Sequence, residues 1–280
     1  MFHLVFRQPP ISTAIAVLAL TALAGCASMP EPAVKRATEP SSAAPTKSVL
    51  WVGNSFFYYN NSMHGHVGHL IRGSAMVDKR GFRGVSATIS GSGLNWHDVE
   101  AHFKPGGVGS YSFDGNNNVV FNKFDKPFDV VMMMDCSQCP IHPQLRPLFY
   151  DAVKKNSEIV RRHGARPALF MSWAYSDKPE MTEQLAAEYI AAGRAHQAQV
   201  VPAGLAFAAS IKARPDINLY TSDKRHPSMA GTYLAACTVL ASIYGASPVG
   251  NSYTADLPPE TARFLQGVAW ETVQQFASRK

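Results

Sequence analysis

Residues 48–55 read SVLWVGNS, an apolar run that stops at Gly53 and is followed by Asn54 and Ser55. A short apolar run bounded by turn residues predicts a buried strand, here the one that opens a folded domain. Gly53 allows a sharp turn, so we expect the next helix to begin at Ser55, with the hydroxyl at the edge of the sheet. Serine is also a favoured helix N-cap, and this stretch alone favours that structural role.

Strands and helices are expected to alternate along the rest of the chain. The expected strands cover residues 48–53, 84–89, 128–134, 167–173 and 200–202, and the expected helices cover 62–72, 148–163, 181–197, 205–212, 229–244 and 259–278. Residues 104–126 are rich in Gly and Asn and are expected to form a loop or a small hairpin. The alternation predicts a three-layer α/β/α domain around a mainly parallel five-stranded sheet.

The composition is that of one globular domain. The 280 residues are 46% apolar and 16% charged, which is enough chain for one large core. The net charge of +6 comes from scattered basic residues, so we expect no nucleic-acid partner. His64, His66 and His69 lack the glutamate of a metalloprotease helix and are interpreted as incidental surface residues. We expect neither a metal nor another cofactor.

The first 26 residues have the pattern of an export signal. Arg7 precedes an apolar run over residues 11–23, which is shorter than the roughly 20 residues that a transmembrane helix needs. Residues 23–26, LAGC, resemble a bacterial lipobox, which implies that Cys26 is lipidated. By the same resemblance, Ala27 implies an outer-membrane lipoprotein of the cell envelope that faces the periplasm. An ordinary signal peptide and an anchor helix are the alternatives.

The segment between this signal and the first strand has the composition of a linker. Residues 27–47 are rich in Pro, Ala, Ser and Thr and have no apolar period. Such a composition predicts a flexible tether. The folded domain is therefore expected to span residues 48–280.

A second polar cluster precedes the helix expected over 229–244. Residues 219–228 read LYTSDKRHPS, so Asp223 and His226 share one loop. A carboxylate can orient an imidazole, and the imidazole can activate a serine hydroxyl at another strand end. A surface loop held by Asx-turn chemistry is the alternative for this pair alone. Active sites of open parallel sheets lie beyond the carboxyl ends of the strands, so Ser55 is the candidate nucleophile.

Three short blocks, taken together, resemble those of the SGNH (GDSL-like) hydrolases. Residues 53–56, GNSF, resemble the Gly-Asp-Ser-Leu block, and Ser90 with Gly91 resembles the second block. Residues 223–228, DKRHPS, resemble the final Asp-x-x-His block. The resemblance covers residues 48 to about 250 in the family's order. It implies the flavodoxin-like architecture of that family and a serine esterase activity.

The same resemblance assigns roles to individual residues. Ser55 is the expected nucleophile, His226 the general base and Asp223 the carboxylate that completes the triad. The backbone N–H groups of Ser55 and Gly91 are the expected oxyanion donors, with Gly93 as a second candidate for the glycine donor.

One block departs from the family pattern. After the third strand the family has Gly-x-Asn-Asp, whose Asn binds the oxyanion, whereas residues 135–140 here read DCSQCP. Gln138 is the only neutral amide in that segment and is the expected replacement donor. The chain is similar to a little-characterised branch with Gln at this place, which residues 173–175, WAY, also match.

The polar and thiol groups around that block allow several roles. Cys136 and Cys139 form a C-x-x-C pair, for which a local disulfide is favoured over a thioredoxin-like or zinc site. Asp135 is a competing carboxylate partner for His226. Trp96 and His97 either line the substrate cleft or pack in the ordinary way.

The sequence therefore predicts an exported, lipid-anchored serine esterase that acts through an acyl-enzyme, with acyl groups on glycans or lipids as substrates. A non-catalytic glycan-binding lipoprotein that keeps the fold is the alternative. A metal- or thiol-dependent periplasmic enzyme is a third and weaker hypothesis.

Overall fold

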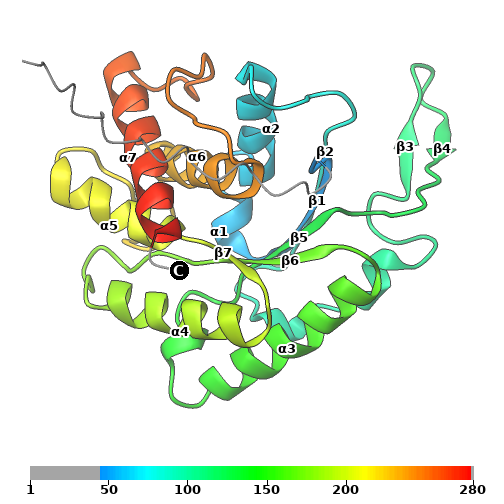
Figure 1. The fold of residues 1–280 in the computed structure, drawn as a ribbon, viewed down its shortest axis with the longest axis horizontal. Helices are drawn as coiled ribbons and strands as arrows, with labels where there is room; N and C mark the ends of the chain where they lie inside the picture. The colour runs from blue at the N-terminus through cyan, green and yellow to red at the C-terminus, as the bar shows by residue number, and fades with distance from the viewer. Residues whose placement is uncertain (1–44, 279–280) are drawn as a thin grey trace, which may run out of the picture. The chain divides into compact units, whose positions relative to one another are not determined.

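The computed structural model describes residues 45–278 (Figure 1). The predicted signal peptide over 1–26, the lipidation site Cys26 and all but the last residues of the predicted tether over 27–47 lie outside these residues. Among the helices of the described part, none is long and apolar enough to cross a membrane. Its buried residues run from Thr46 to Thr272, so this part of the chain carries its own core.

A five-stranded parallel sheet forms the centre of the domain, as predicted. Its strands are β1 Ser48–Gly53, β2 Arg83–Thr88, β5 Val130–Met133, β6 Arg166–Phe170 and β7 Gln199–Val201, in the order β2-β1-β5-β6-β7. The strand β1 pairs with β2 on one side and with β5 on the other. Its apolar run is continuous because both faces are buried, whereas β2 is an edge strand and is half-buried throughout.

Seven helices within residues 45–278 surround the sheet. They are α1 Ser55–Tyr58, α2 Met63–Gly73, α3 Arg146–Arg162, α4 Met181–Ala195, α5 Ala203–Ala213, α6 Met229–Tyr244 and α7 Pro259–Ala277. Figure 1 shows α3 and α4 on one face of the sheet and α2, α6 and α7 on the other, and α5 packs against both α6 and α7. This is the three-layer arrangement that the alternation of strands and helices predicts.

The helix α6 lies between the other helices of its layer and is buried on nearly all sides. It carries no charged residue, which is typical of a helix without a solvent face. Ser228 caps its first turn by accepting a hydrogen bond from the N–H of Gly231, and Gly245 ends it with φ of 62°. The free thiol of Cys237 is buried inside this helix. The cap fixes where the preceding loop, which carries His226, meets the domain.

The segment between β2 and β5 is less regular than the rest. Strands β3 Tyr111–Phe113 and β4 Val119–Phe121 form an antiparallel hairpin, so the second of the two expectations for this segment is correct. Figure 1 shows the hairpin standing clear of the layers. Short 3₁₀ turns follow strands β2 and β5, namely η1 Leu94–Trp96, η2 Glu100–Phe103 and η3 Cys139–Ile141.

Candidate active site

The turn after β1 is organised by Asn54, the residue before the candidate nucleophile. Asn54 is the N-cap of α1, and its side-chain oxygen accepts a hydrogen bond from the N–H of Phe56 at 3.2 Å. Its amide donates to the carbonyl oxygens of Ser92 at 3.0 Å and of Asp135 at 3.1 Å. One buried side chain therefore joins the loops that follow β1, β2 and β5. Because Asn54 takes the capping role, the Ser55 hydroxyl remains available for another partner.

The Ser55 hydroxyl is bonded to a histidine from the far end of the chain. Its Oγ lies 2.8 Å from Nε2 of His226, and Nδ1 of the same ring lies 2.5 Å from Oδ2 of Asp223. Ser55 is 8% exposed, so the residue is largely buried. The structure thus brings the three predicted triad residues into one hydrogen-bonded chain. This is the geometry in which an imidazole can take a proton from a serine.

Asp223 is held by donors from its own loop. Its Oδ1 accepts from the Thr221 hydroxyl at 2.8 Å and from the N–H groups of Arg225 at 2.9 Å and His226 at 3.0 Å. Burial tends to raise the pKa of Asp223, but the hydrogen bonds from His226, Arg225 and Thr221 outweigh it and hold the pKa well below the ordinary value. The Asp223 carboxylate therefore carries its negative charge under the conditions in which the His226 imidazole accepts a proton.

Aromatic rings surround the imidazole of His226, although the sequence blocks that contain Phe56 and Trp173 assigned them no such role. The ring of Tyr59 stacks on it with centroids 4.1 Å apart and planes within 6°, and Phe56 meets it edge-on at 5.3 Å. Trp173 stacks on Phe56 at 4.8 Å and donates its indole N–H to the carbonyl oxygen of Arg225 at 2.9 Å. The tryptophan of the predicted WAY segment thus supports the loop of the candidate base.

Two glycines follow β2, and each position needs glycine for a different reason. Gly91 has φ of 69°, a conformation that favours glycine, and a side chain there would meet open space. Gly93 has ordinary φ, but a Cβ there would lie 2.6 Å from Oδ1 of Asn95 and 3.1 Å from Oδ1 of Asp135. Gly91 is therefore needed for backbone conformation and Gly93 for close packing. Which of the two N–H groups faces an oxyanion stays a prediction.

A cavity of about 220 Å³ lies between the loops that follow β2 and β5. The residues that line it are Gly91, Gly93, Asn95, Trp96, Asp135, Cys136, Cys139, Leu145 and Leu148. The Trp96 ring is 62% exposed, whereas His97 is buried and bonded to the Ser92 hydroxyl at 3.0 Å. Of the two residues considered for the cleft, Trp96 lines this cavity and His97 packs inside.

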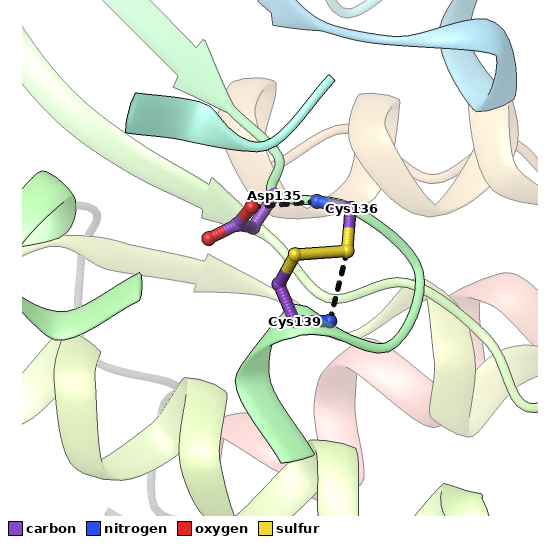
Figure 2. Close-up of side chains that lie close together, drawn as sticks. All are labelled: Asp135, Cys136 and Cys139. Carbon is purple, nitrogen blue, oxygen red and sulfur yellow. Dashed lines mark hydrogen bonds between the residues drawn. A yellow bond between two sulfur atoms is a disulfide. The ribbon is translucent and has the colours of Figure 1, made fainter. Parts of the chain in front are cut away.

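The segment that carries Gln138 is closed by a disulfide. Cys136 and Cys139 are bonded, and the N–H of Cys139 donates to Sγ of Cys136 at 3.0 Å (Figure 2). Gln138 is half-buried, precedes η3 and does not cap it with its side chain. Ser137 contacts the Tyr175 hydroxyl at 2.7 Å. The disulfide holds Gln138 on a short loop beside the cavity, and its role as an oxyanion donor stays a prediction.

Asp135 belongs to the same cluster and has no part in the triad. Its Oδ1 accepts from the N–H groups of Leu94 at 2.9 Å and Cys136 at 2.7 Å, while the carboxylate partner of His226 is Asp223. Ligand atoms of Asp135, Cys136 and Cys139 lie within 4.8 Å of one another. The two sulfurs are bonded to each other, however, and a metal binds the thiolate form of cysteine. Burial raises the pKa of Asp135, although the two N–H donors oppose this.

The histidines after Ser55 are not all surface residues, and that prediction is wrong for His66. His66 is buried, with Nδ1 2.7 Å from the Tyr253 hydroxyl and Nε2 2.6 Å from the carbonyl oxygen of Asn60. His64 is half-buried and contacts the Ser62 hydroxyl at 2.7 Å, and His69 is exposed. Sequence spacing does not reveal this, because the partners of His66 lie on separate loops.

Comparisons of structure find several similar proteins, although no protein-family model and no curated protein matches the sequence. A DUF4886 family protein from Bacteroides uniformis has a TM-score of 0.57 and 17% identity, over 82% of this chain and 95% of that one. A protein from Slackia heliotrinireducens, described as a candidate SGNH hydrolase, has a TM-score of 0.51 and 20% identity, over 71% and 99%. An acetylxylan esterase from Geobacillus stearothermophilus has a TM-score of 0.50 and 13% identity, over 72% and 96%.

Proposed function

We propose that this chain, whose fold is that of the SGNH hydrolases, is a serine hydrolase that cleaves carboxylic esters. The observation that carries the proposal is the hydrogen-bonded chain from Ser55 through His226 to Asp223, at 2.8 and 2.5 Å. A serine hydroxyl is a weak nucleophile near neutral pH, and an adjacent base oriented by a third group activates it. This activation is what the three side chains supply.

The reaction proceeds in two halves. In the first, Ser55 Oγ attacks the ester carbonyl carbon while His226 Nε2 accepts the hydroxyl proton, and Asp223 stabilises the imidazolium that forms. The tetrahedral intermediate collapses, His226 gives its proton to the leaving alcohol, and an acyl-enzyme remains. In the second half, water attacks the acyl group while His226 accepts a proton. The bond between the acyl carbon and Ser55 Oγ then breaks, His226 returns its proton to Oγ, and the carboxylic acid is released.

The negative charge on the carbonyl oxygen needs donors on the other side of Ser55. We assign this role to the N–H groups of Ser55 and Gly91 and to the side-chain amide of Gln138. The cavity beside Gly91 and the disulfide-closed loop of Gln138 support the assignment. Losing one such donor costs about 3–4 kcal/mol of transition-state stabilisation in serine hydrolases.

The cellular setting is part of the same proposal. We propose that the enzyme is exported, lipidated at Cys26 and retained at the outer membrane facing the periplasm, where acyl esters of glycans or lipids are within its reach. The disulfide between Cys136 and Cys139 supports an oxidising compartment, because disulfides are rare in the cytosol. Metabolic labelling with a radioactive fatty acid tests the anchor, and we expect Cys26→Ser to abolish incorporation.

A glycan-binding protein without activity is the second candidate. The exposed ring of Trp96 beside the cavity favours it, since aromatic faces bind sugar rings, and so does the replacement of the family's Asn by Gln138. This candidate predicts binding of cell-wall sugars by a protein that does not turn over any ester.

Hydrolysis of p-nitrophenyl acetate by residues 45–280 tests the proposal. We expect Ser55→Ala to lower kcat by at least about 10³-fold, because the nucleophile is lost. Ser222→Ala is the matched control, since this exposed serine lies beside Asp223, and its activity should equal that of the wild type. Full activity in Ser55→Ala would reject Ser55 as the nucleophile.

A further inference from the structure

Three consecutive residues between α1 and α2 have a backbone conformation that side chains disfavour. Asn60, Asn61 and Ser62 have φ of 53°, 62° and 69°. Left-handed conformations are costly for residues other than glycine, although Asn tolerates them best. A run of three therefore persists only where surrounding contacts hold it. The loop directly follows the short helix that begins with Ser55.

The contacts that tie the loop to distant parts of the domain come from Asn60. Its side-chain amide donates to the carbonyl oxygen of Pro227 at 2.9 Å and to the Thr232 hydroxyl at 2.8 Å. Its own carbonyl oxygen accepts a hydrogen bond from Nε2 of the buried His66 at 2.6 Å. Nδ1 of that ring then pairs with the Tyr253 hydroxyl at 2.7 Å. The Asn61 side chain is exposed and, among the described residues, Ser62 bonds only to residues within four positions, so the hydrogen bonds from this loop to distant parts of the domain run through Asn60.

Asn60 is connected to the candidate base His226 in two ways. Pro227, which Asn60 binds, directly follows His226, and Tyr59, which directly precedes Asn60, lies flat on the imidazole at 4.1 Å. The hydrogen bonds to Ser55 and Asp223 fix the line through the two ring nitrogens. They leave the ring free to tilt about that line. A face-to-face contact within 6° removes this freedom, because a tilted imidazole would collide with the phenol ring.

On the basis of the proposed function, we infer that Tyr59 and Asn60 are positioning residues, which set the plane of the His226 imidazole for proton transfer from Ser55. Tyr59 acts on the ring face, and Asn60 anchors both Tyr59 and the backbone after His226. Proton transfer depends steeply on geometry, and a displacement of about 1 Å can lower a rate by about 10²-fold. The loop therefore contributes to kcat without contacting the substrate.

A pair of matched glycine variants tests the role of Asn60. Asn60→Gly keeps the left-handed backbone accessible and removes the hydrogen bonds to Pro227 and Thr232, whereas Asn61→Gly makes the same change at an exposed side chain. With p-nitrophenyl acetate, we expect Asn60→Gly to lower kcat about 10-fold with KM within twofold of the wild type. Asn61→Gly should match the wild type. Equal kinetics of the two variants would overturn the role of Asn60.

Two substitutions test the role of Tyr59, one that keeps its aromatic ring and one that removes it. Tyr59→Phe keeps the stacked ring and should retain kcat, whereas Tyr59→Leu should lower kcat by about 10-fold or more at unchanged KM. A rise in KM alone for Tyr59→Leu would mean that the side chain binds substrate, and the inference would be wrong.

A readout that needs no turnover keeps this inference separate from the proposed function. The proton on Nδ1 of His226 is bonded to Asp223, and its exchange with solvent can be followed by proton NMR. We expect exchange to be several-fold faster in Asn60→Gly and Tyr59→Leu than in Asn61→Gly. Equal exchange rates would reject the positioning role, whereas a wild type without esterase activity would reject only the proposed function.

Discussion

The two sides of Ser55 are built in different ways. On the side of the base, Asp223 and His226 lie three residues apart on one loop, and the hydrogen bonds to Asp223 come from that loop. On the side of the predicted oxyanion donors, separate loops after β2 and β5 are joined by the side chain of Asn54. A short sequence block therefore carries the pairing of the acid with the base, whereas the assembly of the oxyanion side depends on contacts between separate loops.

The two carboxylates of the site show the consequence of this difference. Burial opposes ionisation of both, but the pKa of Asp223 is lowered and the pKa of Asp135 is raised. Asp223 accepts three hydrogen bonds on one oxygen and pairs its other oxygen with His226. Asp135 accepts two backbone N–H groups on one oxygen, and they do not offset its burial. Asp223 has more donors and is more exposed than the buried Asp135, and both differences favour its ionised form.

The largest effect is expected on the side of the base, from Asp223→Asn. An amide removes the negative partner of His226 and favours the wrong tautomer, so we expect kcat to fall by about 10³–10⁴-fold. Asp177→Asn is the control, because its carboxylate pairs with the exposed Lys224 instead. Steady-state kinetics and thermal unfolding are measured together. A loss of less than about tenfold in a folded Asp223→Asn protein would contradict the triad.

On the other side, Gln138→Ala tests the replacement donor. We expect a loss of about 10²–10³-fold in kcat, since a neutral amide would no longer reach the oxyanion. Gln144→Ala removes an exposed amide a few residues further along the chain and should have no effect. Unchanged kinetics in Gln138→Ala would mean that its side chain is not an oxyanion donor. Only the backbone N–H groups of Ser55 and Gly91 would then remain as donors.

A smaller effect is expected when the disulfide is replaced by serines in Cys136→Ser/Cys139→Ser. The closed loop is very short, so the stability lost should be at most about 2 kcal/mol in urea unfolding. We expect a loss of about tenfold in kcat, less than in Gln138→Ala, because the donor remains but is held less firmly. A larger loss than in Gln138→Ala would mean that the disulfide positions more than this side chain.

The smallest expected effect comes from Asp135 and concerns how the free energy of unfolding depends on pH. A raised pKa means that folded Asp135 keeps its proton to higher pH than the unfolded chain, which titrates near about pH 4. Its stability contribution therefore falls as pH rises from there through the folded pKa. Asp135→Asn removes this fall, because an amide oxygen can accept the same N–H groups of Leu94 and Cys136.

The variant is compared with the wild type by urea unfolding from pH 4 to 8. We expect the stability of Asp135→Asn relative to the wild type to rise with pH, and the exposed Asp151→Asn to show no such trend. Asp223 has a lowered pKa, so its contribution is present above about pH 4 and is lost as the pH falls. A relative stability of Asp135→Asn that fell with pH would contradict the assignment.

The sequence best predicted those structural features that depend on residues close together in the chain. The buried run of β1, the uncharged helix α6 and the block from Asp223 to Ser228 are local patterns, and each lies where it was expected. The contact between Ser55 and His226 joins residues 171 positions apart, and its prediction needed the rule that active sites lie beyond the strand ends together with the family resemblance. Cross-loop contacts of Asn54, Tyr59 and Asn60 have no periodic signal. The run Asn60-Asn61-Ser62 was the one available sign, because such residues tolerate left-handed turns.

Covalent labelling by a fluorophosphonate probe, with the tagged residue mapped by mass spectrometry, tests the account most directly. The probe phosphonylates a serine only where a base has activated it, and it does not depend on knowing the substrate. We predict one adduct, on Ser55, that is absent from Ser55→Ala and strongly reduced in His226→Ala. A folded wild-type protein that remained unlabelled, or that was labelled at another serine, would contradict the account.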